Sequence, residues 1–345
     1  MKVEFKDLLS RSETFLVITI FIALLFIMGY IFFTPNYYQG NSPVKFDIKK
    51  GEPFSQVVDR LFINGIIPSK SNFRIAAFFY GAEKRVRAAR YYIPNGLSYL
   101  DLLDLFINGD CNFARKVVIG NGATINWIAS KLQWQVYIDS VDFINKANDT
   151  DFLQSLGHYQ PSLEGYLFPE EYEVYEHSSP EEVITLFYKG NKDFFVDSLK
   201  RRCDELGYSI HEILTLASIV EGETNLVQEM PKIAGVYHNR LNRGMKLQAD
   251  PTIQYLLPGG WRRLLYKDLE IDSPYNTYMY EGLPPAPINN PRKDAIIAAL
   301  YPEQHNYLYF VSNGNGGHKF SRTHSGHLKN VREYRRWLKS QNQLQ

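Results

Sequence analysis

The sequence predicts an α+β protein with a single transmembrane helix near its N-terminus, followed by a small α+β module and a larger mixed α+β domain. Three observations predict this: an apolar run at residues 15–33, a repeated strand–turn–helix pattern within residues 44–120, and helices that alternate with long loops and a hairpin over residues 121–345. The part after the apolar run, about 300 residues, is too long for one small domain. Residues 1–14 are then expected to form a cytoplasmic tail and residues 34–43 a polar linker.

The apolar run, Phe15 to Phe33, has the length and composition of a membrane-spanning helix. As a helix its 19 residues would extend about 28 Å, close to the hydrocarbon thickness of a bilayer. Three basic residues precede the run, and the first charged residue after it is Lys45. The positive-inside tendency therefore predicts an N-terminus in the cytoplasm and a remainder outside the cytoplasmic (inner) membrane. A cleaved signal peptide fits less well, because the run is long and no small-x-small cleavage site follows it.

The small module, residues 44–120, is predicted from two similar halves. A strand at 44–48 leads through a turn into a helix at 56–64, and a strand at 90–93 leads through Asn-Gly into a helix at 98–108. Both helices end in Leu-Phe-Ile-Asn-Gly, although Asn-Gly also suits helix ends for capping reasons. The module could be a spacer or could bind an extended polymer, and the sequence leaves both roles open.

A third strand, at 114–119, ends the small module. The larger domain, from residue 121, is mostly helical up to residue 208. Those helices are interrupted by Ser162–Tyr172, a segment with aromatic residues, glycine and three glutamates that is typical of a loop beside a cleft. Its carboxylates could take part in a site or could simply be solvated.

The C-terminal half is punctuated by proline and glycine. Pro231 and Gly244 bound a helix, Leu247–Thr252 is a polar turn, and a further helix opens at Asn290–Pro291. Residues 307–321 read as a hairpin with a glycine-rich turn, and a basic helix closes the chain. Two proline-rich stretches cannot be regular helix or central strand: Ser273–Tyr278 and Gly282–Pro287.

The most informative helix begins at Ser209, where Glu212 completes a capping box. Glu221 falls on the same helical stripe as the apolar residues of this helix, and Glu223 points elsewhere. A carboxylate on an apolar stripe is costly unless it is paired, neutral or in a cleft. Two interpretations follow and stay open: a general acid whose pKa is raised in a cleft, or a core residue paired with an arginine such as Arg240.

Composition and motifs exclude several function classes. The net charge is +1, with 38 basic and 37 acidic residues, which gives no reason to expect a nucleic acid partner. Cys111 and Cys203 match no metal or redox spacing, and separate thiols are favoured over a disulfide. No nucleotide, nucleophile-elbow or zinc-protease motif is present, so no cofactor is expected, and the three C-terminal histidines lack metal-site spacing.

What remains suits a carbohydrate substrate. One convincing carboxylate is surrounded by loops rich in Tyr, Asn, Gln and Pro, and aromatic residues make up 14% of the chain. Neutral hydrogen-bonding side chains and aromatic faces match the hydroxyls and ring faces of sugars.

Several motifs of this chain resemble those of a family, the endolytic murein transglycosylases of the YceG-like type. The motifs that carry the resemblance, in chain order, are Glu164–Pro169, Ala217–Thr224, His238–Leu241, Leu247–Thr252, Tyr275–Tyr278, Gly282–Pro285, Tyr307–Val311 and Gly316–Phe320.

The resemblance implies a single-pass anchored enzyme outside the cytoplasmic membrane that cuts nascent peptidoglycan strands internally, between N-acetylmuramic acid and N-acetylglucosamine. It implies a LysM-like module at 44–120 and a catalytic domain at 121–345. The family's catalytic glutamate falls on Glu221. Glycan strands are the expected partner, with peptidoglycan synthases as further partners beside which such an enzyme would terminate strand growth.

The chemistry expected of Glu221 is that of a single acid and base. It donates a proton to the glycosidic oxygen and then takes the proton of the muramic acid 6-hydroxyl, which closes on C1 and gives a 1,6-anhydro end. Ordinary glycosidases need two carboxylates, whereas an internal hydroxyl removes that need and supplies proximity. A lyase therefore fits one carboxylate better than a hydrolase does.

The candidates for holding the substrate are Gln248, Asn276, Tyr278 and His318, each with a structural or capping role as the alternative. Asp250 is either a second catalytic carboxylate or a structural turn residue. Two other functions stay open: a lysozyme-like hydrolase that uses Glu221 and Asp250, and a non-catalytic peptidoglycan-binding scaffold.

Overall fold

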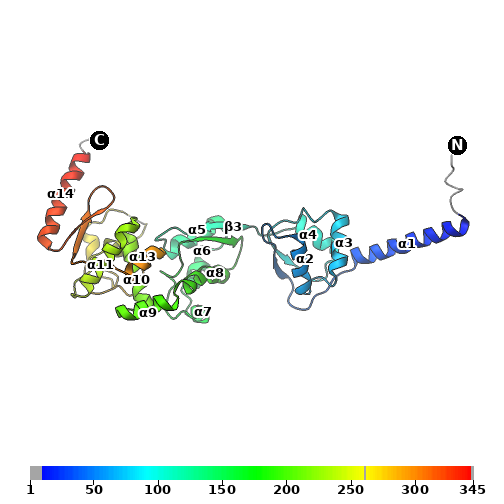
Figure 1. Cartoon of the computed structure of the whole chain (residues 1–345), viewed down its shortest axis with the longest axis horizontal. Helices are drawn as coiled ribbons and strands as arrows, with labels where there is room; N and C mark the ends of the chain where they lie inside the picture. The colour runs from blue at the N-terminus through cyan, green and yellow to red at the C-terminus, as the bar shows by residue number, and fades with distance from the viewer. Residues whose placement is uncertain (1–9, 260–261, 343–345) are drawn as a thin grey trace. The chain divides into compact units, whose positions relative to one another are not determined.

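The computed structural model describes residues 10–259 and 262–342, which form a mixed α+β protein with one apolar N-terminal helix. The chain divides into two compact units, Met1–Ala114 and Arg115–Gln345 (Figure 1). Each unit buries its own hydrophobic cluster. The two cysteines lie in different units, and no disulfide joins them.

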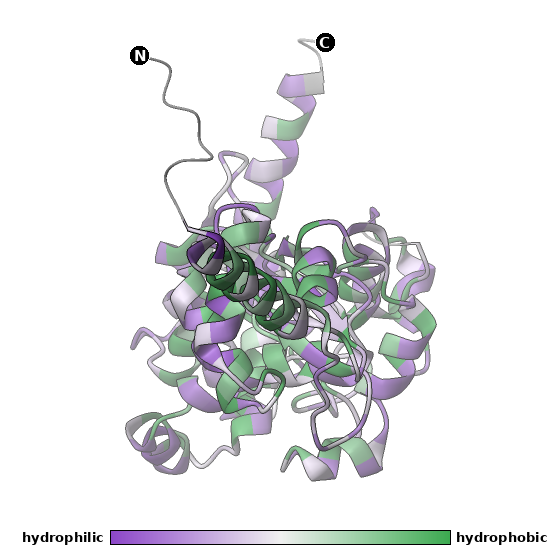
Figure 2. Ribbon diagram, turned by 90° about the vertical axis from the view of Figure 1, so that its right-hand side faces the viewer, coloured by the Kyte–Doolittle hydropathy of each residue, from purple (hydrophilic) through white to green (hydrophobic). Residues whose placement is uncertain are grey.

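Helix α1, Arg11–Phe33, is long and apolar enough to cross a membrane, and Figure 2 shows it as hydrophobic along most of its length. It begins earlier than the predicted run because Ser10 caps it. The Ser10 hydroxyl accepts from the Glu13 amide at 3.3 Å, and the Glu13 carboxylate accepts from the Ser10 amide at 2.7 Å. The expected cytoplasmic tail at 1–14 therefore includes helical residues, and residues 1–9 lie outside the described part of the chain.

The first unit contains β1 (Val44–Asp47), α2 (Phe54–Ile63), α3 (Lys70–Tyr80), β2 (Arg90–Ile93) and α4 (Tyr99–Ile107). Strands β1 and β2 pair antiparallel, with Val44 opposite Ile93. The two predicted strand–turn–helix halves are confirmed. Helix α3 was not anticipated, because the apolar residues Ile75, Phe78 and Phe79 on its exposed side weaken the contrast with its buried side.

The second unit contains two further two-stranded sheets, β3 with β4 and β5 with β6, surrounded by helices. Strand β3 pairs within this unit, so the first compact unit ends at Ala114 and not at residue 120. Its elements are β3 (Ala114–Val118), α5 (Ile125–Val136), α6 (Ser140–Ala147), α7 (Thr150–Ser155), β4 (Glu171–Tyr175), α8 (Pro180–Phe194), α9 (Asp197–Leu206), α10 (Ile210–Glu223), η2 (Val227–Glu229), α11 (Met230–Leu241), α12 (Asp250–Leu256), η3 (Tyr266–Glu270), α13 (Lys293–Leu300), β5 (Tyr309–Ser312), β6 (His318–Ser321) and α14 (His324–Asn342).

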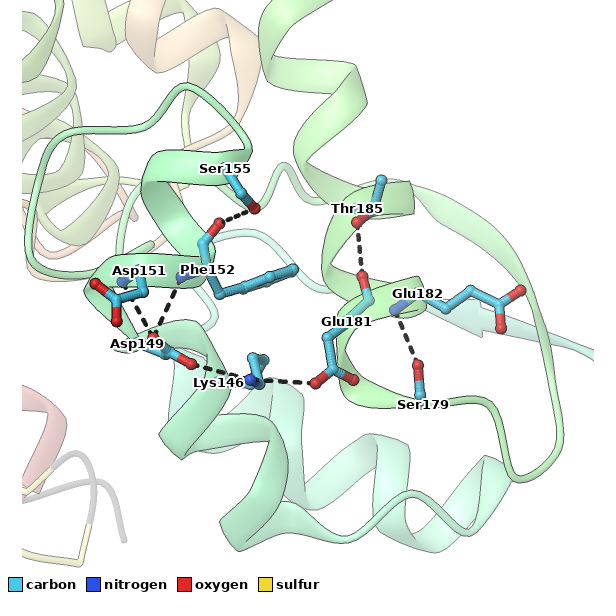
Figure 3. Close-up of polar contacts among 9 residues, drawn as sticks. All are labelled: Lys146, Asp149, Asp151, Phe152, Ser155, Ser179, Glu181, Glu182 and Thr185. Atoms are coloured by element: carbon cyan, nitrogen blue, oxygen red, sulfur yellow. Dashed lines mark hydrogen bonds and ion pairs between the residues drawn. The ribbon is translucent and has the colours of Figure 1, made fainter.

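Polar contacts at helix ends fix α6, α7 and α8 against one another (Figure 3). The ammonium group of Lys146 on α6 lies 2.9 Å from the Asp149 carboxylate and 3.2 Å from that of Glu181 on α8. Asp149 also caps α7, since its Oδ1 accepts from the amides of Asp151 and Phe152.

Helix α10 is the central element of the second unit. It packs against α9, α11, α12 and α13, and every residue from Ile213 to Glu221 is buried. The predicted capping box is confirmed: Ser209 accepts from the Glu212 amide, and Glu212 accepts from the Ser209 amide. A helix that is buried on all sides has no single core-facing stripe, so the place of Glu221 on such a stripe carries less information than the sequence suggested.

Candidate functional site

A cleft of about 1470 Å³ in the second unit opens over the C-terminal end of α10. Its walls come from the turn before α5, from residues 221–226, from α12 and the loop after it, and from the β5–β6 turn. Three glutamates line it: Glu164, Glu221 and Glu223. The Ser162–Tyr172 segment therefore contributes to the cleft, as its composition suggested.

Glu221 is held in a tight ion pair with Arg292, the residue before α13. The Arg292 amide donates to Oε2 at 3.0 Å, Nε lies within hydrogen-bond distance of both carboxylate oxygens, and Nη2 donates to Oε1 at 2.6 Å. Only 2% of the Glu221 side chain is exposed. Both oxygens face N–H donors, so the carboxylate is occupied as an acceptor. The arginine suggested from sequence, Arg240, donates instead to the carbonyls of Leu308 and Leu247.

The Glu221–Arg292 pair is one of several polar contacts between α10 and segment 288–292. Ser218 lies one turn before Glu221 on the same face of α10. The Ser218 hydroxyl accepts from the Ile288 amide at 3.0 Å, and its carbonyl accepts from the Asn289 side chain at 2.8 Å. Glu221 and Ser218 thus fasten one wall of the cleft to the central helix.

Glu223 has a different environment, although it is only two residues further on. Its Oε1 accepts a 2.5 Å hydrogen bond from the hydroxyl of Tyr237 on α11. Burial raises the pKa of Glu223 to about 7; the Tyr237 bond and nearby Arg240 lower it, and the charge of Asp250 raises it. Glu223 is thus a carboxyl group in the cleft that is poised to exchange a proton near neutral pH.

Gly222 separates the two glutamates and lies against α12. A Cβ atom at this position would be 2.6 Å from Cβ of Pro251. A larger residue would fit here only if α12 moved, so glycine is what allows the two segments to pack this closely.

Glu164 is the third carboxyl group of the cleft. Its oxygens accept from the amide of Ile125, at the N-terminus of α5, and from the side chain of Asn290. Burial raises the pKa of Glu164 to about 8, and the Ile125 bond lowers it. The Asn290 oxygen accepts from the amides of Gly165 and Leu167. Glu164 and Asn290 therefore join three separate segments at the base of the cleft.

The structure separates the sequence-predicted substrate residues. Asn276 is fully buried, donates to the carbonyls of Leu269 and Ile271 and accepts from the Tyr278 amide, which is its capping alternative and leaves nothing for a ligand. Gln248 is exposed with a φ of +48° and does not line the cleft.

Asp250 and Tyr278 form a pair of their own beside the cleft. The Tyr278 hydroxyl donates to Asp250 at 2.5 Å, and burial followed by this bond raises the Tyr278 pKa. Neither residue lines the cleft. His318 does line it, with its Nδ1 2.7 Å from the carboxylate of Glu229 and its amide donating to the same group at 3.0 Å.

Comparison with known proteins decides the family. The sequence profile of the YceG-like family matches residues 46–333. The chain belongs to the YceG-like family. It is 31% identical over 324 residues to the endolytic murein transglycosylase of Bacillus subtilis strain 168, an alignment that covers 90% of this chain and 89% of the relative.

Two further matches agree. The endolytic murein transglycosylase of Streptococcus pneumoniae R6 is 28% identical over 293 residues, which cover 74% of this chain and about half (52%) of that protein. A 2.6 Å crystal structure of a yceG-like protein from Listeria monocytogenes aligns with a TM-score of 0.57 and 30% identity over 83% of this chain and 98% of that chain.

This YceG-like chain also has cleft residues that the motifs did not single out. Trp127 on α5 and Tyr255 on α12 both line the cleft and are 46% and 37% exposed. Tyr237, the partner of Glu223, is buried beneath it. The sequence carries no signal for the first two, because their place in the cleft is visible only in the folded chain. Among the described residues no group of His, Cys, Asp and Glu could hold a metal ion.

Proposed function

We propose that this chain is a peptidoglycan lyase: an endolytic transglycosylase that cleaves the β-1,4 bond between N-acetylmuramic acid and N-acetylglucosamine in nascent glycan strands and leaves 1,6-anhydro ends. Membership of the YceG-like family and the names of the two relatives support the reaction class. An open cleft of about 1470 Å³ with a protonatable carboxyl group supports a large sugar substrate.

The observation that carries the proposal is the pair of environments around Glu221 and Glu223. Glu221, the residue on which the family resemblance placed the acid, is occupied by Arg292. Glu223 faces the cleft, where within residues 10–259 and 262–342 the Tyr237 hydroxyl is its one hydrogen-bond donor. Its pKa is about 7, the range in which a group can both give and take a proton. We therefore assign the acid and base role to Glu223 and a positioning role to Glu221.

In the proposed reaction protonated Glu223 donates to the glycosidic oxygen as the bond to C1 breaks. The carboxylate then accepts the proton of the muramic acid 6-hydroxyl while O6 bonds to C1, so no water is consumed and Glu223 ends protonated again. The Tyr237 hydroxyl stabilises the transient carboxylate. The attacking hydroxyl belongs to the same sugar, which supplies the advantage of proximity.

Substrate binding is assigned to the exposed rings of Trp127 and Tyr255, whose faces suit sugar rings, and to His318. Asp250 acts on Glu223 through charge, since its carboxylate raises the Glu223 pKa, and the Tyr278 hydroxyl donates to Asp250. Gln248 is exposed and lies outside the cleft, so it is assigned no role in binding.

The proposed cellular location follows from helix α1 near the N-terminus. Helix α1 anchors the protein in the cytoplasmic membrane with the enzyme outside, where glycan synthesis by peptidoglycan synthases supplies the substrate and where cleavage ends strand growth. The module of the first unit is LysM-like; its β1–α2–α3–β2 order and antiparallel strand pair are compatible with this assignment.

Mass spectrometry of glycan products tests the proposal. The full chain in detergent is incubated with polymerised glycan strands beside Glu223→Gln, Glu221→Gln and a control, Glu170→Gln, whose carboxylate lies in an exposed ion pair. We expect anhydro ends from the wild type and the control, and a loss of about 10²-fold or more in Glu223→Gln.

Other outcomes point elsewhere. Reducing ends instead of anhydro ends would make the enzyme a hydrolase and implicate Asp250. A loss confined to Glu221→Gln, in a protein that remains folded, would return the acid to Glu221. Binding without cleavage by any variant would favour a scaffold.

A further inference from the structure

Helix α3 is apolar on two sides. Phe73, Ala76 and Ala77 are buried in the core of the first unit. On the outer side Ile75, Phe78 and Phe79 are 39%, 71% and 66% exposed. These three residues follow i, i+3, i+4 spacing and form one stripe, called here the α3 stripe. Two phenylalanine rings exposed on one short helix mark an interaction surface.

The α3 stripe is continuous with the last turn of α1. The ring of Phe32 lies edge-on to that of Phe79, with 6.0 Å between centroids. Ile31 and Phe32 pack against the core of the first unit. Helix α1 ends at Phe33, and the Asn36 amide donates to the Leu97 carbonyl at 2.9 Å, so the chain enters the unit without a long free tether. The end of a membrane-spanning helix and the α3 stripe are therefore at the same level.

We propose that the α3 stripe lies in the outer interface of the lipid bilayer beside α1, so that the first unit rests on the membrane surface. Aromatic side chains are favoured at this level of a bilayer. Arg74, exposed next to Ile75, suits lipid phosphate groups. This inference rests on the membrane anchor proposed above and is independent of the cleavage reaction.

Tryptophan fluorescence can test this surface because the four tryptophans of the chain all lie after residue 114. A tryptophan introduced into the first unit is seen as the difference from wild type. We would reconstitute the full chain and a Phe78→Trp variant in phosphatidylcholine–phosphatidylglycerol vesicles, with and without brominated lipid in the bilayer and acrylamide in the buffer.

Phe113→Trp is the matched control. Phe113 is an aromatic residue of 39% exposure near the other end of β2, where the Arg90 amide donates to the Asn112 carbonyl. Asn36, directly after α1, instead pairs with Gly96 and Leu97 beyond the opposite end of β2. We expect brominated lipid to quench Phe78→Trp several-fold more than Phe113→Trp, and acrylamide to show the reverse order. Phe79→Trp repeats the measurement if Phe78→Trp loses its circular dichroism spectrum.

Two results would overturn the inference while leaving the anchor intact. Equal acrylamide quenching in both variants would mean that the stripe faces water, and shielding from both quenchers would mean that protein, such as a second copy, covers it. Flotation of the vesicles reports the anchor separately: a chain that fails to float contradicts the anchor and this inference together.

Discussion

At the scale of single residues, Glu221 and Glu223 show how the surrounding groups determine what a carboxyl group can do. Both stand at the end of α10 and both line one cleft. Glu221 is surrounded by Arg292 donors, whereas Glu223 meets one tyrosine hydroxyl in a desolvated position. Burial raises the pKa of Glu223, whereas the Arg292 donors occupy both carboxylate oxygens of Glu221. This contrast is the basis for proposing Glu223 as the acid.

The pH dependence of cleavage tests this assignment. Because Glu223 must be protonated to act, kcat/KM should fall about tenfold per pH unit as the pH rises above the Glu223 pKa of about 7. The Tyr237 bond lowers that pKa, so Tyr237→Phe should move the alkaline limb to higher pH and reduce the maximal rate. The measurement is kcat/KM on glycan strands from pH 5 to 9. An alkaline limb that Tyr237→Phe leaves in place would argue against Glu223.

At the scale of elements, the Glu221–Arg292 pair joins α10 to the start of α13. The two side chains are 2% and 14% exposed, and the segment they fasten also pairs with Ser218, Glu164 and residues 122–123 through its backbone and Asn290. The shape of the cleft therefore depends on how one loop is fixed to one helix.

Removing Arg292 should be costly. In Arg292→Met the Glu221 charge is left buried without a partner, and we expect a loss of about 3 kcal/mol in the free energy of unfolding of the second unit. Urea unfolding followed by tryptophan fluorescence measures it, because all tryptophans lie in that unit. Lys293→Met, which breaks a neighbouring exposed pair with Glu170, should cost less than about 1 kcal/mol. Equal losses in the two variants would mean that the buried Glu221–Arg292 pair matters no more for stability than the exposed Lys293–Glu170 pair.

At the scale of the whole molecule, the two units have separate cores. Leu61 is fully buried in the first, and Leu214 is fully buried in the second. Because the cores are separate, a substitution in one unit should leave the packing of the other unchanged. The stability of each unit can therefore be measured separately.

Leu61→Ala should destabilise the first unit by about 2–5 kcal/mol through the lost contacts and the cavity. Since no tryptophan lies before residue 115, the fluorescence midpoint in urea should stay unchanged, while hydrogen exchange in residues 44–113 becomes faster. Leu214→Ala should lower the fluorescence midpoint instead. A shift of that midpoint by Leu61→Ala would show that the units unfold together.

Much of the fold could be predicted because local rules govern it. Some features depend only on residues that are neighbours in the sequence. Examples are the Ser209 capping box, the apolar run of α1 and the turn of the β5–β6 hairpin. Helix α3 escaped prediction because its outer side is apolar too. From the sequence, Asn276 could either cap backbone groups or bind substrate. Its complete burial in the folded chain shows that it caps.

The sequence by itself determined an α+β chain of the YceG-like type, an N-terminal helix long and apolar enough to cross a membrane, and the α10 segment that holds the two glutamates. Only the tertiary structure decided which glutamate is paired and which is desolvated, because Arg292 lies 71 residues from Glu221 and Tyr237 lies 14 residues from Glu223. Proton affinity depends on burial and on the charges and donors within a few ångströms. Folding alone brings those groups together.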